Sequence, residues 1–485
     1  CYGYQFFINR MKPKTIFLTL TGISHFLFFG CSLPLAQKNP PLGISYPPHW
    51  ESNTTSIESN LSESGWADTL GGIPLKRLIE QAWINNPDLQ VSAERLIAKG
   101  EQATILGAQL LPSARAEVTG SRSKRNLIGF NLPNGSTSFT SNSFTSGLNI
   151  SWELDLWGKL ADKRDSALRA FEADSLEYKS SRLSLAGQTA KAWYDLIEGT
   201  QQLDLARKSA QSFIQNQTFV EERFEKGLAN GLDKNLAQAI SATAQAQSLA
   251  LAGQLESDTR RLNFLLGKYP SSTLDQNLSK EIGEFPNPQI FISTPSQTLI
   301  KRPDLLAAEK KALSAGLDLR VARKNFFPSL ALTGGPGSRS DEFENLLDQN
   351  FQTWGINGSF TQPIFNGGRL RAAHRQAKAI QAAAWGQYRS TALRAFVEVE
   401  NLLAAEIRLA GQEKLIELAA QSSEQAAELS WERYQRGVEG IFNALENQRR
   451  AFDARSRAFT IRKQRLHNRI DLYLALGLSP MAEKS

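Results

Sequence analysis

Residue types that usually carry enzyme chemistry are scarce in this 485-residue sequence, which has 4 His and 2 Cys. So few candidate ligands exclude a disulfide framework and a zinc site built on Cys, and they argue against a multi-His metal centre. The run Gly334–Gly337 resembles a phosphate-binding loop, but no Lys-Ser or Lys-Thr pair follows it. We therefore expect no catalytic residue, no cofactor and no metal, and we predict that the protein is not an enzyme.

Cys31 is the one residue whose setting suggests a covalent modification. Met11 is the expected start, basic residues follow it, and a mostly apolar stretch of 14 residues then leads to a small residue before Cys31. This order is typical of a secretory signal, and a Cys directly after the cleavage point resembles a bacterial lipobox. Phe28 and Phe29 stand where the lipobox usually has Leu and a small residue. The pattern predicts export and lipid attachment at Cys31, with an ordinary signal peptide as the alternative.

The charge balance and the segment after Cys31 limit further the classes of protein to which this chain can belong. Loss of the three basic residues of the signal lowers the formal net charge from +7 to +4, a surplus too small to predict nucleic-acid binding. Residues 32–63 are rich in Pro, Ser and Asn, which is typical of an extended linker.

The body of the chain is an internal repeat. Two motifs recur 216 residues apart and two others recur 210 residues apart, in the same order. The pairs are Asn86–Leu89 with Arg302–Leu305, Leu111–Ser113 with Phe327–Ser329, Arg223–Gly227 with Arg433–Gly437, and Leu265–Gly267 with Ala475–Gly477. Four ordered matches at near-constant spacing indicate two copies of one unit that differ mainly in one loop.

Long stretches without proline predict long helices. No Pro occurs from 134 to 269 or from 364 to 479, and an interior Pro would break a helix. We expect helices over 160–226 and 369–436, each followed by a Gly-bearing turn and a returning helix, at about 233–266 and 441–476. Asp233 is expected to be the N-cap of the first returning helix. Shorter helices are expected over about 75–109 and 296–326.

Alternating residues between these helices predict two β-hairpins, over 113–156 and 329–365. Leu148, Ile150, Trp152 and Leu154 share one face, and polar residues share the other. One interpretation is a small sheet packed on a soluble core. The other is a set of transmembrane strands, since each has about 10 residues and Trp152, Trp157 and Trp354 lie towards strand ends. Four strands cannot close a barrel, but three copies would supply twelve.

These features together resemble a known family. Gly65-Trp66, Pro74-Leu75 and Leu78-Ile79 precede the first Pro-Asp-Leu motif of the repeat. With the duplicated hairpins, they are similar to the TolC-like outer-membrane efflux proteins, most of all to the lipoprotein branch that serves resistance-nodulation-division pumps. The resemblance implies a mainly α fold with a transmembrane β-barrel part, in which long helical hairpins and β-hairpins of a homotrimer form an α-barrel and a 12-stranded β-barrel.

The resemblance also implies partners and site residues. The expected partners are a periplasmic adaptor (membrane fusion) protein, an inner-membrane pump and outer-membrane lipid. The adaptor would dock on the tips of the helical hairpins, at Gly227, Leu228, Gly231, Gly437, Val438 and Gly440. Phe442 and Glu446 align with an apolar ring and an acidic ring that narrow the periplasmic end. Three Glu446 carboxylates would then repel anions and attract cations.

The expected function is a passive outer-membrane duct of a tripartite efflux system, for drugs or other small molecules. Alternatives are the outer channel of a type I peptide or protein secretion system and a periplasmic coiled-coil scaffold without a pore. The expected location is the outer membrane, lipid-anchored and extending into the periplasm. The expected organisation is a signal peptide (1–30), a lipid anchor and linker (31–63), a first repeat (64–270), an inter-repeat linker (271–295), a second repeat (296–480) and a tail (481–485).

Overall fold

The computed structural model describes residues 45, 47–52, 65–126, 138–273, 295, 298 and 301–481. The expectations for the signal peptide and for Cys31 lie outside these residues, as do most of both linkers and the end of the tail. Residues 44–485 form one compact unit, which contains all helices and strands of the described part.

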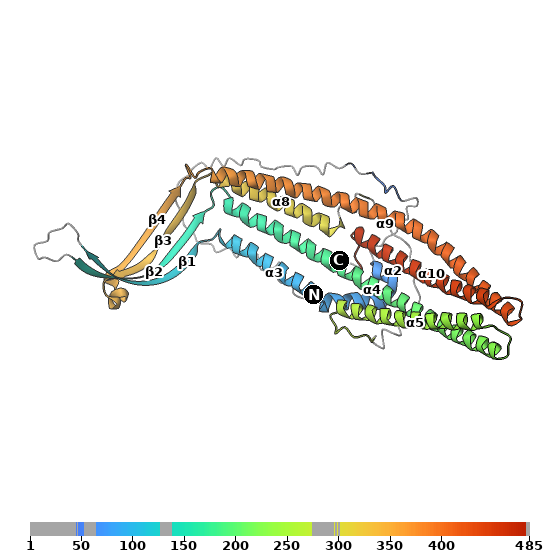
Figure 1. Ribbon diagram of the computed structural model, residues 1–485. Coiled ribbons are helices and arrows are strands. Elements are labelled where there is room, and N and C mark those ends of the chain that lie inside the picture. Colours follow the sequence, from blue (N-terminus) through green and yellow to red (C-terminus); the bar gives the residue numbers. More distant parts are fainter. Residues whose placement is uncertain are drawn as a thin grey trace, which may run out of the picture. The chain divides into compact units, whose positions relative to one another are not determined.

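Each repeat contains helices, a β-hairpin, a very long helix and a returning helix, in that order (Figure 1). The elements of the first repeat are α2 (Trp66–Asn85), α3 (Pro87–Ala108), β1 (Ser113–Asn126), β2 (Ser138–Leu154), α4 (Lys159–Glu225) and α5 (Gly231–Leu265). Those of the second are α8 (Pro303–Lys324), β3 (Ser329–Ser340), the 3₁₀ turns η1 (Phe343–Leu347) and η2 (Gln349–Phe351), β4 (Gln352–Thr361), α9 (Arg369–Gln435) and α10 (Ile441–Ala475). None of the helices in the described ranges is both long enough and apolar enough to cross a membrane.

The expectation of one helix over about 75–109 is wrong, because the chain breaks at Asn86. Asn86 is extended (φ −68°, ψ 120°) and Pro87 begins α3. Proline disfavours the helical conformation of the residue before it and lacks the N–H that a continuing helix would need. Arg302 and Pro303 repeat this arrangement at the start of α8.

The long helices stand in two rows. Near the sheet the order is α3, α4, α8 and α9, each packed on the next. Towards the turns at their far ends, α4 packs on α5 and α10, and α10 packs on α9. α4 and α9 therefore run through both rows (Figure 1). Each row is a single helix thick, so its helices expose two faces.

The strands form one antiparallel sheet in the order β1-β2-β3-β4. The two residues of each cross-strand pair point to the same face of the sheet. Pairs such as Ala114 with Ile150 and Leu330 with Phe360 make one face apolar. Pairs such as Arg115 with Asn149 make the other face polar. The outer edges of β1 and β4 have no partner strand within the described residues.

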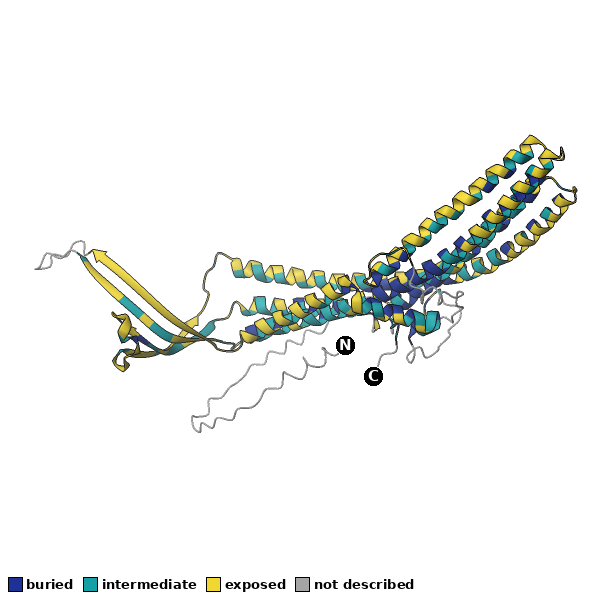
Figure 2. Cartoon of the chain, turned by 90° about the horizontal axis from the view of Figure 1, so that it is seen from below, coloured by how far each residue is buried: buried dark blue, intermediate teal, exposed yellow. Residues whose placement is uncertain are grey.

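The apolar core lies where α2, α4, α5 and α10 meet, midway along the long helices. Figure 2 shows buried residues gathered there, whereas the sheet and the helix ends are mostly exposed. Trp66 and Tyr473 stack at 6.4 Å between ring centroids, and the Tyr194 hydroxyl donates a hydrogen bond to the Leu70 carbonyl. We call this region the waist. It fixes the position of both helical hairpins relative to the row below the sheet.

Candidate functional site

Both helical hairpins turn through the same glycine-based cap. Gly227 has φ +73°, its N–H donates to the Phe224 carbonyl, and the Leu228 N–H donates to the Arg223 carbonyl at 2.7 Å. Gly437 (φ +72°) and Val438 repeat these two bonds at the end of α9. Nothing lies within 4 Å of a Cβ added at Gly227 or Gly437. Glycine is therefore required at both turns for its backbone conformation and not for lack of space.

The returning helix α5 begins with a capping box. The Asp233 N–H donates to the Asn230 side chain at 2.9 Å, and the Asn230 N–H donates to the Asp233 carboxylate at 3.3 Å. The expectation that Asp233 is itself the N-cap is wrong, because Asn230 occupies that position and Asp233 lies three residues on. The box satisfies free N–H groups at the start of the helix from both directions.

The other predicted tip residues leave the tips apolar and uncrowded. Leu228 and Val438 are about two-thirds exposed. Gly231 and Gly440 have no left-handed φ, and nothing lies within 4 Å of a Cβ added at either one. Nothing within the described chain therefore requires glycine at these two positions. Leu232 (74% exposed) adds to this surface; it was missed, although it lies 210 residues before Phe442 and is therefore its repeat counterpart.

Phe442 and Glu446 lie on the first turns of α10, four residues apart and thus on one helix face. Phe442 is exposed. The carboxylate of Glu446 accepts hydrogen bonds from Nε and Nη2 of Arg449 and from Nε of Arg450, all at 2.9 Å. Arg449 also reaches Asp453 at 2.7 Å. Hydrogen bonds from Arg449 and Arg450 lower the pKa of Glu446 to about 2. These two acids and two bases balance one another, so Glu446 is not a bare acidic site.

This charged group belongs to the second hairpin alone. A shift of 210 residues places Leu236, Ala239 and Ile240 where the second hairpin has Glu446, Arg449 and Arg450. Leu236 and Ile240 pack against the apolar cluster near the tips. The duplicated hairpins have therefore diverged, one towards packing and one towards an exposed charged face.

The two hairpins are joined near their tips by packed side chains. Val220 of α4, Ala237 of α5 and Tyr434 of α9 share one buried cluster with Ile441 and Leu445 of α10. The guanidinium of Arg223 lies 5.5 Å from the Tyr434 ring centroid, and burial raises the pKa of the Tyr434 hydroxyl although Arg223 opposes the shift. The Asn216 amide nitrogen lies 2.6 Å from the Gln448 side-chain oxygen. Movement of one hairpin tip away from the other would break these contacts.

Ion pairs hold α9 and α10 together along much of their length. Four arginines of α10 face four glutamates of α9, at Arg455, Arg462, Arg465, Arg469 and Glu406, Glu413, Glu417, Glu424. Glu406 and Arg469 are both almost completely buried. Burial raises the pKa of Glu413, but hydrogen bonds from Arg465 and Arg462 outweigh it and hold that pKa below its usual value. We call this set the α9–α10 ion-pair seam.

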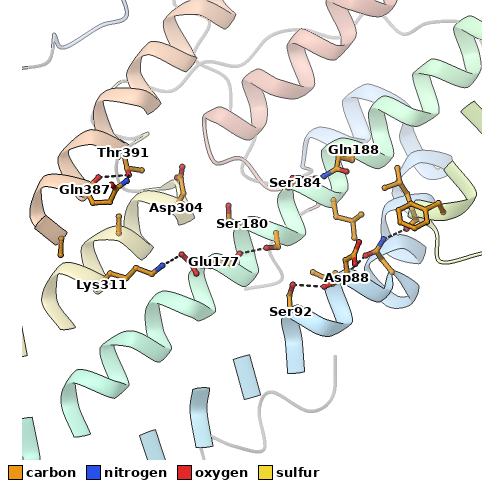
Figure 3. Close-up of a pocket in the computed structure, with 18 residues that line it drawn as sticks. Asp88, Ser92, Glu177, Ser180, Ser184, Gln188, Asp304, Lys311, Gln387 and Thr391 are labelled. Atoms are coloured by element: carbon orange, nitrogen blue, oxygen red, sulfur yellow. Dashed lines mark hydrogen bonds and ion pairs between the residues drawn. The ribbon is translucent and has the colours of Figure 1, made fainter. Parts of the chain in front are cut away.

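A cavity of about 870 Å³ opens on the row of helices above the waist (Figure 3). Residues from α3, α4, α8 and α9 all line it, so it lies on one side of the row, and the row is concave there. Its lining combines hydroxyl and amide side chains with apolar ones, and Asp88, Glu177, Asp304 and Lys311 are the charged members. Lys311 pairs with Glu177, and Asp304 pairs with Arg302 at 2.8 Å.

The family follows from a comparison with known proteins. The sequence model of the family described as "Outer membrane efflux protein" matches residues 78–268 and 294–478, one segment in each repeat. The chain belongs to the outer membrane efflux protein family. The two matched segments coincide with the two structural repeats, and the family's name states its location and its role in transport.

Individual relatives agree with this assignment over nearly the whole chain. The chain is 31% identical to the pyoverdine export outer membrane protein OpmQ of Pseudomonas putida, over 92% of this chain and 94% of the relative. It is 27% identical to the toluene efflux pump outer membrane protein TtgC of Pseudomonas putida, over 94% of each. The crystal structure of the Campylobacter jejuni CmeC outer membrane channel matches with a TM-score of 0.80 at 25% identity, over 92% of this chain and 95% of that one.

The structure can now be placed in the cell. As an outer-membrane efflux protein, the chain lies in the outer membrane and extends into the periplasm. The four-stranded sheet, with one apolar face, is the part that can contact lipid. The long helices extend from one end of the sheet (Figure 1), and they form the periplasmic part. The hairpin tips therefore point away from the outer membrane (Figure 1).

Proposed function

We propose that three copies of this chain form the outer-membrane duct of a tripartite efflux system. The passage exports small molecules and is passive, with energy supplied by an inner-membrane pump. The chain carries out no catalysis, and its described side chains contribute walls and contacts.

The observation that carries this proposal is the pair of open edges. The sheet ends at β1 and β4, and the helical row ends at α3 and α9 in the same order. Four strands cannot close a barrel by themselves. If β4 of one copy pairs with β1 of the next, three copies supply twelve strands and twelve helices. The concave side of each row, with its cavity, then faces the inside of the ring.

The tips of the helical hairpins have a surface to which a partner protein can bind. Leu228, Leu232 and Val438 present apolar surface to solvent, and Gly231 and Gly440 leave open space beside it. We propose that a periplasmic adaptor covers these residues and connects the duct to the pump. Exposed apolar groups grouped at one end of a molecule are typical of protein interfaces.

Phe442 and the Glu446 group are proposed to line the periplasmic aperture. Three-fold symmetry would bring together three copies of each residue. Because Arg449 and Arg450 already bind Glu446, the aperture would be a ring of paired charges and not a bare acidic ring. Such a ring holds its side chains in place through charge-assisted hydrogen bonds.

The cargo is proposed to be small molecules of mixed chemistry. Relatives are named for export of pyoverdine and of toluene, one polar and one apolar. The cavity lining in Figure 3 combines hydroxyl, amide and apolar groups, which can pass either class without binding one tightly. Cys31 is proposed to carry the lipid that anchors the chain to the outer membrane.

A complementation experiment tests the function. A strain that lacks this chain should accumulate more of an expelled dye than its parent, and the intact chain should restore the low level. The tip variant Leu228→Asp/Val438→Asp should reach the outer membrane in normal amount and fail to restore export. Normal dye levels in the deletion strain under conditions where the parent expresses the chain would contradict the proposal.

A further inference from the structure

The apolar face of the sheet ends at a defined height. Proceeding from the helices, its rows begin with Leu154, Leu330 and Phe360. On β1 and β2 they end with Gly120 paired to Phe144, and on β3 and β4 they end with Pro336 paired to Trp354. From Leu154 to Phe144 is ten residues, about 33 Å along the strand. At a strand tilt of about 40°, this corresponds to about 25 Å across the membrane, the height of the apolar band of a transmembrane barrel.

Two basic residues continue the same face beyond this band. Side chains of a strand alternate between faces, so Arg122 and Lys124 lie on the face of Ala116, Val118 and Gly120. They follow Gly120 by two and four residues, or about 7 and 13 Å along the strand. The strand runs away from the helices towards its tip. Both residues therefore lie at the height of the head groups in the outer leaflet.

Neither basic side chain has a partner among the residues that the structure describes. Arg122 and Lys124 are exposed, and no ion pair or hydrogen bond joins either side chain to another residue of the described part. The paired residues across on β2 are Asn142 and Thr140, which are also exposed. A cation beside an amide or a hydroxyl donor is the combination that binds phosphate oxygens.

The nearby acidic residues lie across β2. Asp341, Glu342, Glu344 and Asp348 belong to the connection between β3 and β4, and Phe343 of that connection packs on Phe144 of β2 at 5.8 Å between ring centroids. β1 is on the opposite side of β2. The acidic residues therefore lie on the β3 side of β2, and the basic pair lies on the β1 side, where it is available to an anion.

We propose that Arg122 and Lys124 bind the phosphate groups of a phosphorylated glycolipid in the outer leaflet. The apolar band below them contacts the acyl chains of the same molecule, and the β2 hydroxyl and amide groups share its phosphates. The inference rests on the proposed function, in which this sheet spans the outer membrane. It assigns a lipid contact to the outer rim, separate from the passage and from the hairpin tips.

The chain offers a closely matched control. Arg125 lies three residues beyond Arg122 on the same strand and is also exposed, but it belongs to the opposite face. The variants Arg122→Gln, Arg122→Gln/Lys124→Gln and Arg125→Gln would be purified as full chains in mild detergent. Each would be titrated with bis-phosphorylated lipid A and with the same lipid stripped of its phosphates. Native mass spectrometry would count the bound lipid.

We expect Arg122→Gln to weaken binding of the phosphorylated lipid about fivefold, and the double variant about twenty-five-fold. Arg125→Gln should bind like the wild type, and the stripped lipid should bind the wild type as weakly as the phosphorylated lipid binds the double variant. An equal loss in Arg125→Gln, equal binding of both lipids, or full displacement by millimolar inorganic phosphate would overturn the proposal.

The same variants separate this inference from the proposed function. The double variant should still fractionate with the outer membrane and restore dye export in the deletion strain. If export is restored but the double variant binds lipid normally, the lipid contact alone is wrong. If the wild type is found outside the membrane fraction, both proposals are wrong.

Discussion

The carboxylate of Glu446 is held by Arg449 through two hydrogen bonds of 2.9 Å, one from Nε and one from Nη2. Both residues lie on the outer turns of α10, one helical turn apart. Glu446 is the side chain that the proposed duct places at its narrow periplasmic end. The aperture is therefore expected to behave as a ring of ion pairs. The negative charge of Glu446 should act on passing ions only when its pairing with the arginines is broken.

Removal of the arginines should unmask that charge. In Arg449→Gln/Arg450→Gln, three unpaired Glu446 carboxylates would surround the passage, and a ring of one sign raises the local concentration of counter-ions. We expect the permeability of cations relative to anions to rise about tenfold, measured as the reversal potential of single channels in a planar bilayer under a salt gradient. Adding Glu446→Gln should abolish the rise; a rise that persists would place the charge elsewhere.

The pH response of the aperture should differ between the same proteins. Arg449 and Arg450 lower the pKa of Glu446 from 4.5 to about 2, so the wild-type carboxylate stays charged as the pH falls from 5 to 3. The stabilisation from these pairs is fully present above pH 4.5 and is lost only as the pH approaches 2. In Arg449→Gln/Arg450→Gln, cation selectivity should titrate near pH 4.5. An identical response in both proteins would contradict the pairing.

The α9–α10 seam should contribute unequally along its length. Glu406 is 5% exposed, whereas Glu424 is 43% exposed. Glu406→Ala removes a buried carboxylate that pairs with both Arg465 and Arg469, and it should lower the free energy of unfolding by about 3–5 kcal/mol. Glu424→Ala should lower it by less than about 1 kcal/mol. Hydrogen exchange along α9 and α10, together with thermal melting in detergent, would measure both. Equal effects would show that burial does not set the strength of these pairs.

The four tip glycines should divide into two classes. Gly437→Ala forces a side chain into a left-handed conformation and should destabilise the α9–α10 turn by about 1–2 kcal/mol. Gly440 has no left-handed φ, and nothing lies within 4 Å of a Cβ added there, so Gly440→Phe should fold normally and instead obstruct a docked adaptor. The comparison is made by melting temperature and by affinity for the purified adaptor. Normal adaptor binding by Gly440→Phe would remove this tip from the docking surface.

The two repeats share one contact, which joins residues of the recurring motifs. The side chain of Asn86 donates to the Leu265 carbonyl at 3.1 Å, and Arg302 donates to the Ala475 carbonyl at 2.8 Å. These four residues come from the motifs that recur at 216 and 210 residues. In both repeats, the residue before Pro binds the end of the returning helix. The recurring motifs predicted two copies of one unit, but they did not predict this contact at the waist.

Other features were missed for reasons that differ. The pairing of Glu446 was present in the sequence, since Arg449 and Arg450 lie three and four residues on and such spacings place side chains together on a helix. The break at Asn86 was also signalled by Pro87. The cavity of Figure 3 could not be predicted in this way, because Asp88 and Thr391 line the same cavity only through the lateral order of four helices. A sequence pattern does not specify that order.

Native mass spectrometry of the intact protein, extracted from the outer membrane in mild detergent, tests the central claim most directly. The open edges of the sheet and of the helical row need further copies for closure. Eight strands from two copies would leave a lumen filled by side chains, so the account predicts a complex of three chains. A single chain recovered from the soluble periplasmic fraction would contradict the duct, and so would a membrane complex of two chains.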